Sequence, residues 1–387
     1  MDFGFTEEQE LLRQSVREFC EAEISQEKVR EWEETLDFMP QDLWDKMASL
    51  GFFSMSVPPE YGGEGGDMVT AMIGLEEISK ASTAVALGVG ATIGFGARPL
   101  VVLGTEEQKQ EYLHRIARGE LKFSLALTEP AGGTDILGAI STYADLDGED
   151  YVINGQKIYI TGAHVADYLT TVAITDRENP KRARALSIFM VKADTPGIEI
   201  RLIPKVSTHS CGSCEVFYSD VRVPAANLLG TLNNGWYDLL TTLNPERIGV
   251  AMMSVGVAEA VFDACLAYSR EREAFGKPIG QFMVIQHYLA DIAVGIENAR
   301  NLVYKCAWLQ DAGKPYHVEA TMAGLYASKM ALDAATVGME IFGGYGVTME
   351  ADIQRYWRDS QQMVFSPISN EMSKNFIAQC YGLPRSY

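Results

Sequence analysis

The spacing of hydrophobic residues changes twice along the chain, and these changes divide it into three blocks. Residues 1–120 repeat apolar side chains with the period of an α-helix, as in "MVTAMIGLEEISKAS". Residues 121–232 instead alternate apolar and polar side chains, as β-strands do. From residue 233 the helical period returns in long segments interrupted at "GKPIG", "DAGKPY" and "FGGYG". Helix, sheet and helix in separate blocks predict an α+β fold with domains 1–120, 121–232 and 233–387.

Short signals within the blocks predict individual elements. Thr6 is followed three residues later by Gln9, a capping-box pattern that predicts a helix beginning after Thr6. "YVINGQKIYIT" has alternating runs on both sides of Asn154-Gly155, which predicts a β-hairpin that turns at these two residues. "ALSIFMVKADTPGIEIRLI" predicts two further strands separated by a Pro-Gly turn.

Composition excludes several classes of function. The formal net charge is −20, so we expect no binding to nucleic acid or anionic lipid. No uninterrupted run of about 18 apolar residues occurs, and the acidic N-terminus lacks the pattern of a signal peptide, so we expect a cytoplasmic protein that does not span a membrane. Cys211 and Cys214 form a lone CxxC that leads into a predicted strand, and we interpret them as inert side chains. The five histidines are widely spaced, so no metal site is predicted.

Two glycine-containing segments are candidates for ligand contact. "LALTEPAGGTD", residues 125–135, offers backbone N–H groups and the hydroxyls of Thr128 and Thr134 to a phosphate or a polar ring edge, and an ordinary turn is the alternative. "EIFGGYG", residues 340–346, reads either as a helix C-cap or as a close approach of backbone to ligand. Neither GxGxxG nor GxxxxGK[ST] is present, so a Rossmann nicotinamide site and a P-loop are both unsupported.

A carboxylate stands before the most apolar helical stretch of the chain, in "LNPERIGVAMMSVGVAEAVF". Asn244 suits a helix N-cap and Pro245 the first helical position, which predicts Glu246 in the first turn. There the helix dipole favours an acid for structural reasons alone. The alternative is a base held in a dry pocket, and the local pattern does not choose between the two.

Six segments, taken in order, resemble the acyl-CoA dehydrogenase family of flavoenzymes: "LTEPAGGTD", "GQKIYITGAHVADY", "VRVPAANLLG", "NPERIGVA", "YSREREAFGKPIGQF" and "EIFGGYGVT". The resemblance covers essentially the whole chain. It implies an N-terminal helical domain, a middle β domain and a C-terminal four-helix bundle. It also implies FAD as cofactor, an acyl-CoA thioester as substrate, an electron-transferring flavoprotein as electron acceptor and a homotetramer. In this reaction a carboxylate removes the α-proton of the acyl group while the β-hydrogen leaves as hydride to the flavin.

The resemblance assigns roles to particular residues. Tyr159 stands where the family stacks an aromatic ring on the flavin, and Thr161 where a hydroxyl bonds flavin N5. Arg272 and Phe275 match a segment that reaches the FAD of another subunit. The remaining cofactor-binding positions implied are Leu127, Thr128, Thr134, Met283, Glu340, Gly343, Gly344 and Ser369. Thr134, Asn244 and Arg247 are implied to contact the substrate.

The resemblance also bears on the identity of the base. Many members carry it in a Tyr-Glu-Gly-Thr segment near the C-terminus, which here reads "SPIS" with Pro367 in place of the glutamate. The isovaleryl and long-chain branches place their glutamate just before an arginine on a helix of the C-terminal domain. Glu246, followed by Arg247, occupies this position, so we expect Glu246 to be the catalytic base, with its pKa raised by burial.

Several positions depart from the family pattern. His164 replaces a glycine near the flavin, a family glutamine is Met283, and the Leu-Gly-x-Arg of the third β segment reads Val206 to His209. These changes leave open an enoyl-CoA reductase, unusual acyl-CoA chemistry, or a non-catalytic CoA- or flavin-binding relative. The length, branching or ring content of the acyl group does not follow from the sequence.

Overall fold

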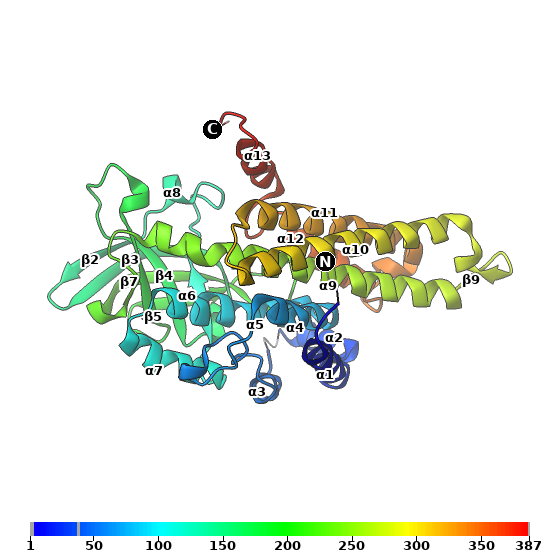
Figure 1. The fold of residues 1–387 in the computed structure, drawn as a ribbon, viewed down its shortest axis with the longest axis horizontal. Helices are drawn as coiled ribbons and strands as arrows, with labels where there is room; N and C mark the ends of the chain where they lie inside the picture. The colour runs from blue at the N-terminus through cyan, green and yellow to red at the C-terminus, as the bar shows by residue number, and fades with distance from the viewer. Residues whose placement is uncertain (1–3, 37–38, 386–387) are drawn as a thin grey trace.

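A computed structural model describes residues 4–36 and 39–385 of the chain. The molecule is elongated, with a β-sheet at one end and a long helical bundle extending to the other, and the N-terminal helices pack along one side of both (Figure 1). Helix, sheet and helix follow one another along the chain, which confirms the predicted α+β fold.

The described part of the N-terminal block consists of helices joined by turns and loops. Its α-helices are α1 (Glu7–Glu23), α2 (Gln26–Thr35), α3 (Gln41–Ser49), α4 (Met68–Ala81), α5 (Thr83–Thr92), α6 (Arg98–Leu103) and α7 (Glu106–Ala117). A π-helical turn, η2 (Ile93–Ala97), joins α5 to α6. The predicted capping box is confirmed, because the Gln9 N–H donates to Thr6 Oγ1 and the Thr6 N–H donates to Gln9 Oε1.

The middle block is one mixed sheet. Its strands are β1 (Phe123–Ala126), β2 (Tyr143–Asp147), β3 (Asp150–Thr161), β4 (Tyr168–Ile174), β5 (Leu186–Lys192), β6 (Ile198–Leu202), β7 (Ser213–Pro224) and β8 (Leu228–Leu229), with the short helix α8 (Ile136–Ala139) after β1. The order is β6-β7-β3-β2-β4-β5-β8, and β1 pairs in parallel with β4. The two strands predicted around the Pro-Gly turn are β5 and β6, and they lie near opposite edges of the sheet instead of pairing.

The predicted hairpin at Asn154-Gly155 is wrong, because β3 runs through both residues as one strand. The chain turns earlier, at Gly148, between the antiparallel strands β2 and β3. Gly155 marks a shift of register against β7, and a Cβ atom there would lie 2.4 Å from Thr142 Oγ1. Asn154-Gly155 therefore forms a β-bulge, and the glycine allows Thr142 to approach the backbone closely.

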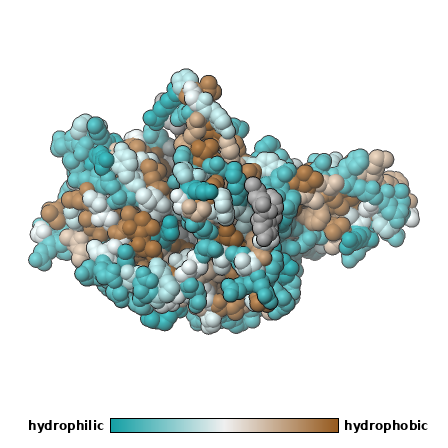
Figure 2. Space-filling view, viewed as in Figure 1, coloured by the Kyte–Doolittle hydropathy of each residue, from teal (hydrophilic) through white to brown (hydrophobic). Residues whose placement is uncertain are grey.

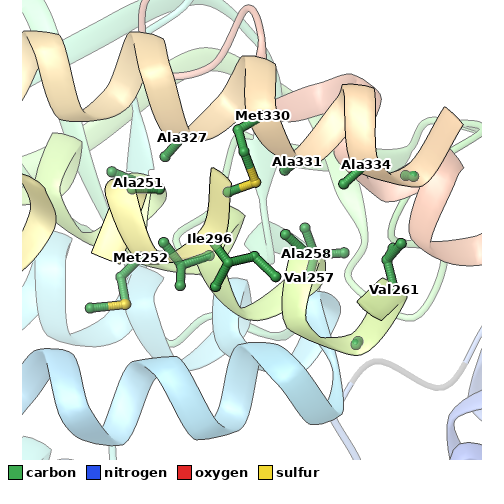
Figure 3. Packing of buried hydrophobic residues seen from close by; sticks show 14 of the residues in the cluster. Ala251, Met252, Val257, Ala258, Val261, Ile296, Ala327, Met330, Ala331 and Ala334 are labelled. Atoms are coloured by element: carbon green, nitrogen blue, oxygen red, sulfur yellow. The ribbon is translucent and has the colours of Figure 1, made fainter. Parts of the chain in front are cut away.

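The C-terminal block consists of long helices. They are α9 (Gly235–Glu271), α10 (Met283–Asp311), α11 (His317–Phe342), α12 (Ile353–Met363) and α13 (Asn370–Cys380), and the ribbon β9 (Glu273–Ala274)–β10 (Lys277–Pro278) lies between α9 and α10. The helices α9 to α12 pack against one another as the predicted four-helix bundle. Many of the side chains in their core are alanines, with Met252, Met330 and Ile296 between them (Figure 3). Small side chains allow the helix axes to approach closely.

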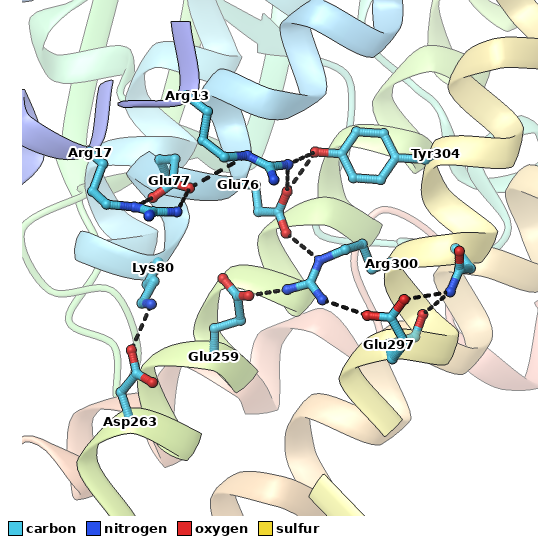
Figure 4. Close-up of polar contacts among 11 residues, drawn as sticks. Arg13, Arg17, Glu76, Glu77, Lys80, Glu259, Asp263, Glu297, Arg300 and Tyr304 are labelled. Atoms are coloured by element: carbon cyan, nitrogen blue, oxygen red, sulfur yellow. Dashed lines mark hydrogen bonds and ion pairs between the residues drawn. The ribbon is translucent and has the colours of Figure 1, made fainter. Parts of the chain in front are cut away.

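A partly buried network of charges ties the N-terminal helices to this bundle (Figure 4). Glu76 of α4 accepts hydrogen bonds from Arg13 of α1 at 3.2 Å, from Tyr304 of α10 at 2.5 Å and from Arg300 of α10 at 2.7 Å. Arg300 also pairs with Glu259 of α9. The network fixes α4 against α9, and these two helices line the cavity described below.

Two helical stretches among the described residues are long and apolar enough to cross a membrane by composition, Thr83–Leu103 and Gly235–Glu271. Their apolar windows are 56% and 61% buried in the protein, as is typical of core helices. Exposed apolar side chains are spread over the sheet and the bundle, and Figure 2 shows hydrophobic patches on both. Phe275, Met283 and Val294 are among the exposed apolar side chains of the C-terminal block.

Candidate active site

Glu246 lies inside a helix and not at its start. The helix α9 begins at Gly235 and continues through Pro245, so the predicted N-cap at Asn244 and the first-turn position of Glu246 are wrong. Asn244 Oδ1 instead accepts a hydrogen bond from Arg247 at 3.2 Å. The positive end of the helix dipole therefore does not account for an acid at this position.

The carboxylate of Glu246 faces a cavity of about 290 Å³ between α4, α5, α9 and α10. Its Oε2 atom is shielded from solvent and has no hydrogen-bond partner. Burial raises the pKa of Glu246 to about 7, although the neighbouring Arg247 guanidinium opposes the rise. A carboxyl group in this state is poised to exchange a proton near neutral pH.

The other carboxylates on the cavity wall are already committed to the backbone. Asp67 caps α4 by accepting a hydrogen bond from the Thr70 N–H at 2.8 Å. Asp311 accepts from the N–H groups of Met68 and Val69, at 2.8 and 3.1 Å. Glu246 is thus the lining carboxylate whose unpaired oxygen is shielded from solvent.

The cavity has an apolar end and a polar end. Beyond Gly249, buried side chains such as Ile78, Val89 and Met253 close it. At the opposite end the wall carries Arg98 and Gln310, together with Asp67 and Asp311, which are exposed. The segment that replaces the family's usual base also reaches the cavity, through Ser366.

The sheet contributes Thr161 to the same cavity. Thr161 ends β3 and lines the wall, and its carbonyl accepts a hydrogen bond from Ser124 Oγ at 2.7 Å. Tyr159, two residues earlier, has φ 61° and is 65% exposed. His164 packs against Gly212, where a Cβ atom would lie 2.2 Å from His164 Cε1, and its Nδ1 is 3.5 Å from Cys214 Sγ. His164 therefore fills space beside β7.

A buried ion pair supports the loop that carries Leu127 and Thr128. Lys157 Nζ donates to the Leu127 carbonyl at 3.1 Å and to Glu129 Oε1 at 2.8 Å. Glu129 also accepts from the backbone N–H groups of Ser141 and Thr142. Burial by itself would raise the pKa of Glu129. The Lys157 ammonium and these hydrogen bonds outweigh burial and hold the pKa of Glu129 well below its ordinary value. No local sequence signal marks this ion pair, although Glu129 and Lys157 both lie within the quoted motifs.

A second hollow lies at the end of α9 and α11. Arg272, Gly343 and Gly344 line this hollow. The rings of Tyr268 and Phe342, which also line it, are stacked with their centroids 4.2 Å apart. Gly343 has φ 58° and follows α11 as its C-cap, and a Cβ atom on either glycine would meet nothing within 4 Å. Phe275, on the β9–β10 ribbon, is 96% exposed.

The remaining predicted site residues lie apart from the lining of both cavities. Thr134 and Glu340 are exposed, and Met283 is 68% exposed at the start of α10. Ser369 is the N-cap of α13, where its hydroxyl accepts a hydrogen bond from the Met372 N–H. Cys211 and Cys214 are both buried free thiols, consistent with inert side chains.

Family profiles for the acyl-CoA dehydrogenase N-terminal, middle and C-terminal domains match residues 6–120, 124–221 and 233–381. A probable acyl-CoA dehydrogenase of Bacillus subtilis, YngJ, is 39% identical over 98% of this chain and 99% of its own. The CarC subunit of a caffeyl-CoA reductase–Etf complex from Acetobacterium woodii is 36% identical over 92% of this chain and 93% of its own. The structure of butyryl-CoA dehydrogenase from Megasphaera elsdenii superposes with a TM-score of 0.94 at 33% identity, over 98% of this chain and 100% of that one. The chain belongs to the acyl-CoA dehydrogenase family.

Proposed function

We propose that the protein is an FAD-dependent acyl-CoA dehydrogenase in which Glu246 is the catalytic base. The observation that carries this proposal is the unpaired Oε2 of Glu246, in a cavity that Thr161 also lines. In its deprotonated form Glu246 takes the α-proton of the acyl group, and the cavity keeps water away from the exchange. A pKa of about 7 lets the carboxylate be both deprotonated and basic near neutral pH. The placement corresponds to that of the isovaleryl and long-chain branches.

The described residues fit FAD. Tyr159 offers an exposed aromatic surface beside Thr161, and Leu127 and Thr128 are held in place by the buried Lys157 ammonium group. The hollow at Gly343 and Gly344 leaves open space where side chains would otherwise stand. We assign Thr134, Met283, Glu340 and Ser369 as further cofactor contacts, and Thr134, Asn244 and Arg247 as substrate contacts. Bound FAD supplies the acceptor for the hydride that leaves the β-carbon.

The cofactor residues fall into two groups that one chain holds apart. Tyr159 and Thr161 belong to the sheet, whereas Phe275 lies beside β9 at the far tip of the bundle (Figure 1). A single FAD does not reach both groups of one chain, so a second copy must complete each site. A dimer is therefore the minimum assembly, and we propose the homotetramer that the family resemblance implies.

In this proposal electrons leave to an electron-transferring flavoprotein. The name of the Acetobacterium woodii relative, a subunit of a caffeyl-CoA reductase–Etf complex, supports such a partner. We also propose a cytoplasmic location and domains 1–120, 121–232 and 233–387. The same name supports a second candidate function, reduction of an enoyl-CoA, in which Glu246 returns the proton. A non-catalytic role gives no reason for an unpaired carboxyl group in a cavity.

Anaerobic mixing with saturated acyl-CoAs tests the function. The panel runs from short to long chains and includes branched and cyclic groups, with flavin absorbance as the readout. We expect bleaching by one class, loss of bleaching in Glu246→Gln, and no loss in Glu271→Gln, an exposed acid on the same helix. Below about pH 7, kcat/KM rises with pH and then levels, because the free enzyme must be deprotonated at Glu246. Oxidation of the reduced enzyme by enoyl-CoAs, with no bleaching by any saturated thioester, would favour the reductase.

A further inference from the structure

Two polar side chains of the cavity, Arg98 of α6 and Gln310 of α10, have no role in the proposed reaction. Arg98 Nε and Gln310 Oε1 are both shielded from solvent, and neither atom has a hydrogen-bond partner. Among the described residues, none forms an ion pair with the Arg98 guanidinium. Burying an unpaired donor and an unpaired acceptor costs free energy, which a ligand group that pairs both atoms would recover.

The packing of α4 on α9 shows where along α9 these atoms lie. A Cβ atom on Gly249 would lie 3.6 Å from Leu75 Cδ2. Seven residues later, a Cβ atom on Gly256 would lie 2.5 Å from Ser79 Cβ. The two helices therefore run side by side in the same direction, and Met68, the first residue of α4, lies toward the start of α9.

The end of α10 is fixed at this same level. Asp311 accepts hydrogen bonds from the N–H groups of Met68 and Val69, so Gln310, its neighbour in sequence, lies beside the start of α4. Arg98 is close by, because burial raises the pKa of Asp311 and the Arg98 guanidinium opposes the rise. Arg98 and Gln310 therefore share one region of the cavity, although they are far apart in the sequence.

The proposed contacts to the carrier of the thioester lie on another face of α9. Asn244 and Arg247 do not line the cavity. At 3.6 residues per turn, Arg247 is turned about 100° from Glu246 around the helix axis, and Asn244 about 160°. Thr134, the third proposed substrate contact, is exposed and also lies outside the lining. The cavity is therefore left to the acyl group, and Arg98 and Gln310 face that group instead of its carrier.

From Glu246 the cavity extends in two directions that differ in polarity. Toward Met253 the wall is apolar and buried, which suits hydrocarbon. In the other direction Thr242 lies one helical turn before Glu246, about 6 Å along the axis, and the wall continues to Arg98 and Gln310. A hydrocarbon chain that pointed this way would leave both polar atoms unpaired.

The chemistry of the two atoms selects the group that fits between them. Arg98 Nε–H is a donor and Gln310 Oε1 is an acceptor, and a hydroxyl group accepts from one partner while its rotatable proton is donated to another. A carboxylate would pair with Arg98 alone, and the charges of Asp67 and Asp311 at this end of the cavity oppose a further anion. We propose that Arg98 and Gln310 bind a terminal hydroxyl group of the acyl chain, so that the substrates are ω-hydroxyacyl thioesters. This inference rests on the proposed function and names the class of its substrate.

Binding of non-reactive CoA thioethers to the FAD-loaded protein tests the inference. Each S-(ω-hydroxyalkyl)-CoA is compared with the S-alkyl-CoA in which a methyl group replaces the hydroxyl, over a series of chain lengths. A thioether has no carbonyl next to the sulfur, so neither probe can be dehydrogenated, and calorimetry measures affinity alone. At the chain length that reaches Arg98, we expect the hydroxyl probe to bind about tenfold more tightly, because the methyl group leaves Arg98 Nε and Gln310 Oε1 unpaired.

Substitutions assign this preference to the two side chains. Arg98→Met and Gln310→Leu should each reduce the ratio of the two affinities to about one. The ratio is taken within one variant, so a general loss of affinity or stability does not imitate the result. Arg118→Met, which replaces an exposed arginine paired with Glu120, is the control and should keep the full preference.

The outcomes distinguish this inference from the proposed function. Equal binding of both probes at every chain length, or a preference that survives either Arg98→Met or Gln310→Leu, would overturn the inference even if acyl-CoAs bleach the flavin. Tighter binding of an ω-carboxyalkyl thioether than of the hydroxyl probe would also overturn it, since the site would then recognise an anion. A hydroxyl preference that both substitutions remove would support the inference even if no acyl-CoA is oxidised, in which case the proposed function alone would fall.

Discussion

Replacing Glu246 by glutamine removes a charge that the folded protein accommodates poorly, so the variant should be more stable than the wild type at alkaline pH. Glutamine has nearly the shape of the protonated glutamic acid, so the cavity wall is preserved. The comparison is independent of any substrate. It therefore tests the environment of Glu246 separately from its role in catalysis.

The size of the effect follows from the shift in pKa. Burial raises the pKa of Glu246 from its ordinary 4.5 to about 7. Between these two values the folded protein retains a proton that the unfolded chain has released, so the free energy of unfolding falls as pH rises. Each unit of difference between the two pKa values corresponds to ~1.4 kcal/mol, so the free energy of unfolding falls by about 3 kcal/mol in all. This decrease is complete once the pH is above the pKa of the folded state. Between about pH 5.5 and about pH 8.5, the advantage of Glu246→Gln over the wild type should grow by roughly 2 kcal/mol.

Urea unfolding at several pH values, with FAD in constant excess, measures this difference. Far-UV circular dichroism and tryptophan fluorescence should report coincident transitions, so that the free energy is well defined. Glu271→Gln, at the exposed end of the same helix, is the matched control and should track the wild type. A stability difference between Glu246→Gln and the wild type that stays constant with pH would refute the inferred desolvation of Glu246.

Two further substitutions probe the supports of the site. Lys157→Met leaves the Glu129 carboxylate buried without its partner and should lower the free energy of unfolding by about 3–5 kcal/mol, with loss of bound flavin. Adding Glu129→Gln, which removes the unpaired charge but keeps an oxygen acceptor for the backbone, should recover much of this loss. A Lys157→Met variant as stable as the wild type would contradict the expected cost. Gly249→Ala places a methyl group 3.6 Å from Leu75 Cδ2 inside the apolar end of the cavity. It should lower kcat/KM for the largest acyl groups by about 10-fold or more while sparing the shortest, and an equal loss for all chain lengths would count against an acyl site there.

Much of the architecture was readable in the amino-acid pattern, because periodicity and helix caps are local properties. The change from helical to alternating spacing near residue 121 and back near residue 233 marks where the sheet begins and ends. The Thr6 capping box formed as expected, since both of its partners lie within three residues. Glu246 was singled out by its place before Arg247 and by the proline at position 367.

Other features depend on residues far apart in the sequence, and local patterns misread them. Asn154-Gly155 has the composition of a hairpin turn, but the pairing of β3 with β7 and the approach of Thr142 hold it in a continuous strand. Asn244-Pro245 has the composition of a helix start, but α9 forms from Gly235 onward and tolerates the proline. In both cases long-range packing outweighs local propensity.

The chemical state of the site is likewise a property of the folded molecule. The same glutamate would be an ordinary acid on an exposed helix. Its raised pKa exists because α4, α5 and α9 exclude water from a cavity whose wall is shared by helices distant in the chain. Nothing in the sequence near Arg98 or Gln310 relates either residue to Glu246. Desolvation and the geometry of unpaired polar groups arise only when these segments pack together, which is why they escape any reading of the chain in one dimension.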